Sequence, residues 1–95
     1  MVQVRATAVR WESDHFPGVI EVVVVDAHRR EHRIIEKLPV LTMLDITADS
    51  AFPIELWIDA ELDGVDGDEV AVTFSHGVET IDGAQGLTVS SADVI

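Results

Sequence analysis

The chain has 95 residues, of which 47% are hydrophobic, enough for one small domain with a single core and too many for a disordered chain. It has no cysteine, which excludes disulfides, thiol catalysis and thiolate metal sites. No apolar run approaches the roughly 18 residues that a membrane span needs, and a net charge of −12 argues against direct binding to nucleic acid.

The N-terminal part of the chain predicts two strands. Alternate residues from 2 to 8 are apolar, as expected for a half-buried strand, but Val9 and Trp11 fall on the opposite phase. That slip predicts a β-bulge near Val9. A Pro-Gly pair predicts a loop over 13–18, and the valine-rich run 19–25 predicts a central strand covered on both faces.

Residues 26–38 are compatible with either a helix or a hairpin. Residues 28–33 contain no apolar side chain that a helix could bury. We therefore expect a turn over 27–30 followed by a strand over 31–37. Residues 40–52 follow no clear pattern, and either a short strand or a single helical turn is compatible with them.

The C-terminal part has the clearest alternation. From Ile54 to Leu62 every second residue is apolar, which predicts a strand, and two Asp-Gly pairs predict a turn over 63–68. A second strand is expected over 70–76, with His76 facing inward as a hydrogen-bonded core histidine. A last strand is expected over 87–89.

Valine, isoleucine and threonine together supply 29 residues, and these side chains pack well on a pleated sheet. With short strands and glycine turns, they predict one all-β domain over 1–95, a compact five- or six-stranded small barrel or sandwich. The expected core consists of Val22, Val24, Ile34, Ile54, Leu56, Ile58, Val70, Val72, Phe74, Leu87 and Val89.

Charge is divided unevenly along the chain. All six basic residues lie in the first 37 positions with six acidic ones, whereas the remaining positions hold twelve carboxylates and no lysine or arginine. Clustered carboxylates around an outward-facing tryptophan predict a surface that binds a basic protein partner. A merely solvated face is the alternative. The acidic surface comprises Glu55, Trp57, Asp59, Glu61, Asp63, Asp66, Asp68 and Glu69.

Motifs for chemistry are weak. The string His28-Arg29-Arg30-Glu31-His32 matches the H-x-x-E-H pattern of inverted zinc peptidases, which requires a helix, a third ligand and a larger scaffold. Carboxylates in 63–69 could offer oxygens to Ca²⁺, but their order is not that of an EF-hand. There is no G-x-S-x-G elbow and no glycine-rich phosphate loop. We expect no enzyme, cofactor or metal.

Two other functional classes remain open. Such a small chain leaves apolar surface that could pair across a homodimer, giving a self-associating structural β domain. The second class is a small barrel that binds a small ligand or a metal ion. Residues 1–5 lack the basic-then-apolar pattern of a signal peptide, which predicts a cytoplasmic location, and no membrane partner is expected.

One stretch carries a resemblance to known proteins. The order of short motifs in this stretch resembles that of small uncharacterised bacterial proteins. The motifs are Glu21-Val22, Asp26-Ala27, the segment 32–40 with its Ile-Ile-Glu-Lys run, and Phe52-Pro53. These are associated with the immunity partners of bacterial toxins. The resemblance covers about half of the chain and implies a β-rich cytoplasmic protein that binds another protein. The scarcity of lysine and the absence of asparagine also suit a GC-rich bacterium.

Overall fold

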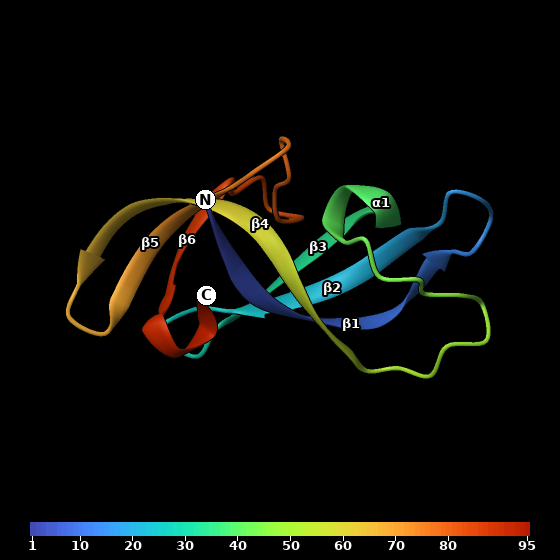
Figure 1. The fold of residues 1–95 in the computed structure, drawn as a ribbon, viewed down its shortest axis with the longest axis horizontal. Coiled ribbons are helices and arrows are strands. Elements are labelled where there is room, and N and C mark those ends of the chain that lie inside the picture. The colour runs from blue at the N-terminus through green and yellow to red at the C-terminus, as the bar shows by residue number, and fades with distance from the viewer.

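The computed structural model describes all 95 residues and contains one six-stranded antiparallel sheet. The sheet curls into a half-barrel, with strand order β3-β2-β1-β4-β5-β6 (Figure 1). The all-β prediction is confirmed. The elements are β1 (Val2–Ser13), β2 (Val19–Val25), β3 (Glu31–Lys37), α1 (Leu38–Leu41), β4 (Ile54–Asp66), β5 (Glu69–Phe74), β6 (Gly86–Ser90) and a 3-10 turn (Ser91–Asp93).

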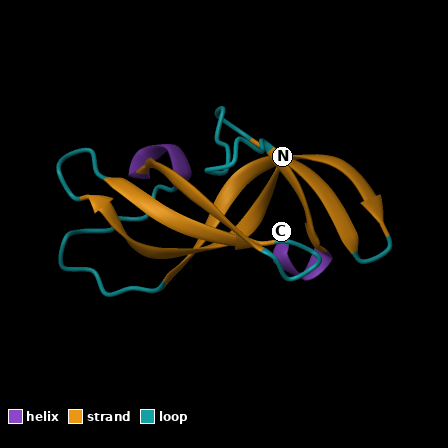
Figure 2. Cartoon of the chain, turned by 180° about the vertical axis from the view of Figure 1, so that it is seen from behind, coloured by secondary structure: helices purple, strands orange, loops and turns teal.

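Two backbone hydrogen bonds connect one edge region of the curled sheet, around β3, with the other, around β6. The N–H of Ala27, in the turn after β2, donates to the carbonyl of Thr88 in β6 at 2.9 Å. The N–H of Ile81, in the connection from β5 to β6, donates to the carbonyl of Arg33 in β3, also at 2.9 Å. Figure 2 shows the curl from behind. Neither helix has the length and apolar character needed to cross a membrane.

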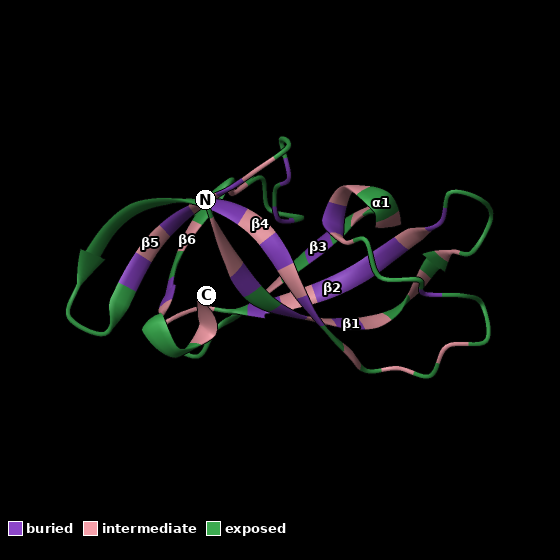
Figure 3. Ribbon diagram, in the orientation of Figure 1, coloured by how far each residue is buried: buried purple, intermediate pink, exposed green.

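The core lies on the inner face of the curl, and every strand contributes to it. Buried and less buried residues alternate along β4 until the strand leaves the body of the molecule (Figure 3). Ile54 and Leu87 are half-buried and pack against the core, and the other nine expected core residues are buried. Leu41, Ile46 and Val78 join the core from outside the strands.

Most expectations for the N-terminal part are confirmed. The register of β1 against β2 shifts between Ala8 and Arg10, where the bulge was expected. The hairpin is also confirmed, since β3 pairs with β2 after a turn. β2 lies between two strands as expected, but it is not covered on both faces along its length. Val25 is 39% exposed, because no second layer covers the outer face of this single sheet.

The prediction of a turn over 63–68 is wrong in its bounds. β4 continues to Asp66, and only Gly67 and Asp68 form the turn, with Gly67 in the left-handed region at φ +62°. A register shift between Leu62 and Gly64 lets pairing with β5 continue. The hairpin thus extends beyond the core, which explains why Leu62 is 49% exposed although its phase predicted burial.

The prediction of His76 as a core residue is wrong. β5 ends at Phe74, and His76 adopts left-handed backbone at φ +63° with its side chain exposed. The N–H of Val78 donates to the carbonyl of Ser75 at 3.3 Å, so the chain turns there, and Val78 is buried. Residues 40–52 contain the end of α1 and an irregular segment with Ile46 buried.

Candidate functional site

The acidic surface occupies the outer face of β4 and the hairpin that β4 forms with β5. Along β4, Leu56, Ile58 and Ala60 are buried, so their neighbours Glu55, Trp57, Asp59 and Glu61 point outward. The structure divides the surface into two parts with different surroundings. The β4 part comprises Glu55, Trp57 and Asp59, and the hairpin carboxylates are Glu61, Asp63, Asp66, Asp68 and Glu69.

The β4 part contains a cation that the local sequence does not show. Arg5 of β1 lies directly opposite Trp57, and its guanidinium carbon is 5.0 Å from the centroid of the Trp57 ring. Arg5 Nη1 is 2.7 Å from a carboxylate oxygen of Glu55, and its Nε is 3.2 Å from one of Asp93. Trp57 therefore already holds one guanidinium, supplied by a strand about fifty positions earlier.

Asp59 is held by two polar side chains. Its carboxylate accepts a hydrogen bond from the Gln3 amide at 3.1 Å, and its second oxygen lies 3.3 Å from His76 Nε2. The hydrogen bond from Gln3, followed by that with His76, lowers the pKa of Asp59 below its usual value. Asp59 thus remains ionised at neutral pH and fixed in orientation.

The hairpin carboxylates have no cation beside them. Every residue from Glu61 to Glu69 is exposed, and none of the five carboxylates forms an ion pair within 4 Å. Asp63 accepts a hydrogen bond from the hydroxyl of Thr73. The hairpin projects from one end of the molecule (Figure 1), so its negative potential is directed into solvent. The structure has no group of three or more histidine or acidic side chains that could hold a metal ion.

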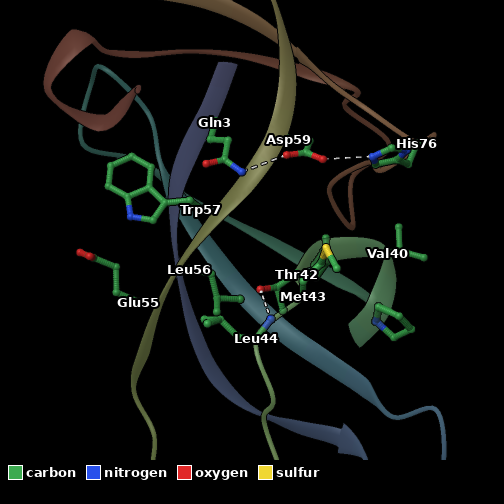
Figure 4. A pocket seen from close by; sticks show the side chains of 12 residues that line it. Gln3, Val40, Thr42, Met43, Leu44, Glu55, Leu56, Trp57, Asp59 and His76 are labelled. Carbon is green, nitrogen blue, oxygen red and sulfur yellow. Dashed lines mark hydrogen bonds and ion pairs between the residues drawn. The ribbon is translucent and has the colours of Figure 1, made fainter. Parts of the chain in front are cut away.

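A groove of about 590 Å³ runs beside β4. One wall is β4 from Glu55 to Asp59, and the other is the segment 39–44, which includes the last three residues of α1 and the exposed side chains of Met43 and Leu44 (Figure 4). His76 also lines it. The groove could not be expected from the sequence, because residues 40–52 follow no pattern that places them against β4.

The histidine string lies on a turn and a strand and not on a helix. His28 is in the turn after β2, whereas His32 is in β3 with its Nε2 2.8 Å from a carboxylate oxygen of Asp26. The hydrogen bond with His32, together with those from the backbone N–H groups of Arg30 and His28, lowers the pKa of Asp26 to about 2. These contacts close the hairpin, which is a structural role.

Comparisons of the chain with protein-family models, with curated proteins and with solved structures give no match. Its function is therefore inferred from its own geometry and charge. Two features set this region apart: carboxylates without cations on a projecting hairpin, and a groove beside the strand that leads into it.

Proposed function

We propose that the chain is a non-enzymatic module that binds a basic protein through the acidic surface, in the manner of an inhibitor or an immunity protein. The observation that carries the proposal is the group of hairpin carboxylates, which are exposed and without ion pairs at one end of the molecule. Like charges held close together destabilise a fold. A basic partner would supply the cations that the chain itself does not place there.

The proposal has a kinetic signature. Attraction between an acidic surface and a basic partner raises the association rate at low ionic strength and is screened when salt is added. Trp57, an aromatic residue beside the carboxylates, adds the kind of side chain that is enriched in binding hot spots. We therefore expect association that is fast at low salt and weakens steadily as ionic strength rises.

A set of three proteins tests the proposal. The first is the unchanged chain, and the second carries Asp66→Asn, Asp68→Asn and Glu69→Gln. The third is a matched control with the same change in net charge, Asp14→Asn, Asp49→Asn and Asp82→Asn, at exposed carboxylates outside the acidic surface that also lack ion pairs. Each protein is immobilised and exposed to lysate of the source organism, then washed with rising salt.

We expect the same basic protein to be retained by the unchanged chain and by the control, and its recovery to fall about tenfold on the hairpin variant, which is 1.4 kcal/mol of binding free energy. Mass spectrometry of the eluates measures this recovery. Equal recovery on all three proteins, or retention of no basic protein by the unchanged chain, would overturn the proposal.

A further inference from the structure

β4 has a neighbouring strand on only one side along its first half. β1 pairs with β4 over Ile54–Ala60, but β5 pairs only from Ala60 onward. The chain leaves the line of β5 after Phe74, where His76 and Gly77 adopt left-handed backbone. We call the space in line with β5, beside residues 54–58, the open lane. The groove of about 590 Å³ lies along it.

The backbone of β4 directs unpaired groups into the open lane. In an antiparallel pair, successive residues direct their N–H and C=O groups to opposite sides. The backbone of Gln3 exchanges hydrogen bonds of 2.8 and 2.9 Å with the backbone of Ile95, on the side of β1 away from β4, so the backbone groups of Gln3 and its opposite residue Asp59 do not bond to each other. The carbonyl of Asp59 instead accepts from the N–H of Ser75 at 3.0 Å.

The same alternation applies to Trp57 and Glu55, which lie two and four residues before Asp59 in β4. The N–H and C=O groups of Trp57 and Glu55 face the open lane, and no turn or loop backbone group bonds to them. Strand edges of this kind are templates for another strand, and proteins that bind extended peptides use them. β4 thus offers two donors and two acceptors in a row beside an open groove.

The two sides of the open lane differ in chemistry. In Figure 4, Leu56 points towards Leu44, whereas Glu55 and Trp57 point to the other side of β4. One side is therefore apolar, with Leu44 and Val40 on the wall opposite Leu56. The other side carries the carboxylates of Glu55 and Asp59 around Trp57.

We infer that an extended segment of the basic partner adds to β4 in the open lane as an antiparallel strand, an inference that rests on the proposed function. Residues directly opposite in an antiparallel pair point to the same face. The partner residues that bond to Glu55 and Trp57 therefore lie on the acidic side and are lysine or arginine. The residues between them are apolar and lie beside the exposed side chain of Leu44 and the half-buried side chain of Val40. The partner segment thus alternates basic and apolar side chains.

A capped heptapeptide of alternating lysine and valine, beginning and ending with lysine, is the probe. Two versions carry backbone N-methyl groups, one on the lysines and the other on the valines, so the three peptides have the same charge. In an antiparallel strand the lysine N–H groups face β4 and the valine N–H groups face away. We expect the valine-methylated peptide to bind within about threefold of the unmodified one, and the lysine-methylated peptide at least about tenfold more weakly.

A variant of the protein gives an independent test. Glu55→Pro removes the N–H that faces the open lane and leaves the pairing with β1 intact, because proline is accepted where a strand edge needs no donor. Glu55→Gln removes the charge and keeps the N–H. We expect about tenfold weaker binding of the unmodified peptide to Glu55→Pro and a loss below about threefold for Glu55→Gln, with circular dichroism showing that both variants fold.

The two proposals fail in different ways. If the lysine-methylated peptide binds as tightly as the unmodified one, or if the unmodified peptide does not bind at low salt, strand addition is overturned. The proposed function still stands in that event if the hairpin variant loses the basic protein from lysate and the matched control retains it.

Discussion

Carboxylates at the two ends of the sheet have opposite surroundings, because cations of the chain pair with them at one end and are missing at the other. At the β1–β3 end, the buried carboxylate of Glu21 lies 3.0 Å from Arg10 and 2.6 Å from Arg33, and these guanidinium groups lower its pKa, the hydrogen bond from Arg33 contributing most. At the other end the hairpin carboxylates are exposed and have no cation. Five of the twelve carboxylates that follow residue 37 thus lie on the hairpin, where no cation of the chain pairs with them.

Two of the hairpin turns show the same contrast. The turn between β2 and β3 is held by Asp26, whose carboxylate accepts from the N–H groups of His28 and Arg30 at 2.8 and 3.0 Å and contacts His32. The turn at Gly67 and Asp68 has no such side-chain bond, and its carboxylates remain free. Acidic residues thus maintain the fold at one end and are available for binding at the other.

The largest expected effect concerns Glu21. Glu21→Gln removes a buried charge that holds two arginines. A hydrogen bond to a charged group contributes about 1.5–3 kcal/mol to the free energy of unfolding. We expect the free energy of unfolding to fall by about 2 kcal/mol. The matched change Glu61→Gln, at an exposed carboxylate without an ion pair, should alter it by less than about 0.5 kcal/mol. Urea unfolding measures both, and equal losses would remove the contrast.

A smaller effect is expected from pH. The pKa of Asp26 is lowered from 3.8 to about 2 in the folded chain, so its stabilisation is present above pH 4 and is lost as pH falls from about 4 towards 2. Asp26→Asn should flatten the decline of thermal stability over that interval, whereas Asp66→Asn should leave it unchanged. Melting curves between pH 2 and 6 test this. An unaltered decline in Asp26→Asn would show that the carboxylate does not hold the turn.

The smallest effect concerns Arg5, the one cation within the acidic surface. Its guanidinium lies over Trp57 and beside Glu55, where a basic partner would lie. Arg5→Gln should therefore strengthen binding of the alternating lysine–valine peptide by about threefold at low salt. Arg30→Gln, with the same change in charge at an exposed side chain without an ion pair, is the control. Fluorescence anisotropy compares them, and equal gains would mean that only net charge matters.

Local periodicity was enough to predict most of the fold. Alternation located β4, β5 and most of the core, and the absence of apolar residues over 28–33 correctly favoured a hairpin over a helix. The bulge near Val9 followed from a slip in phase. Each of these signals lies within one strand or one turn, so the sequence carries it without knowledge of the neighbours.

The parts that could not be predicted depend on which strands are neighbours. Arg5 reaches Trp57 only because β1 pairs with β4 in a particular register, and the open lane exists only because β5 turns away after Phe74. His76 was misassigned for the same reason, since its phase was extrapolated past the end of its strand. Registers and strand ends are set by tertiary packing, which one sequence does not display.

The central claim is that a basic partner binds at the β4–β5 end and not at the β1–β3 end. Titrating the unmodified lysine–valine peptide into ¹⁵N-labelled protein, and following the backbone amide signals, tests it most directly. We predict that shifts concentrate in residues 54–69 and that the amides of Glu55 and Trp57 become protected from hydrogen exchange on binding. Shifts that concentrate around Glu21, or that spread evenly over the sheet, would contradict the account.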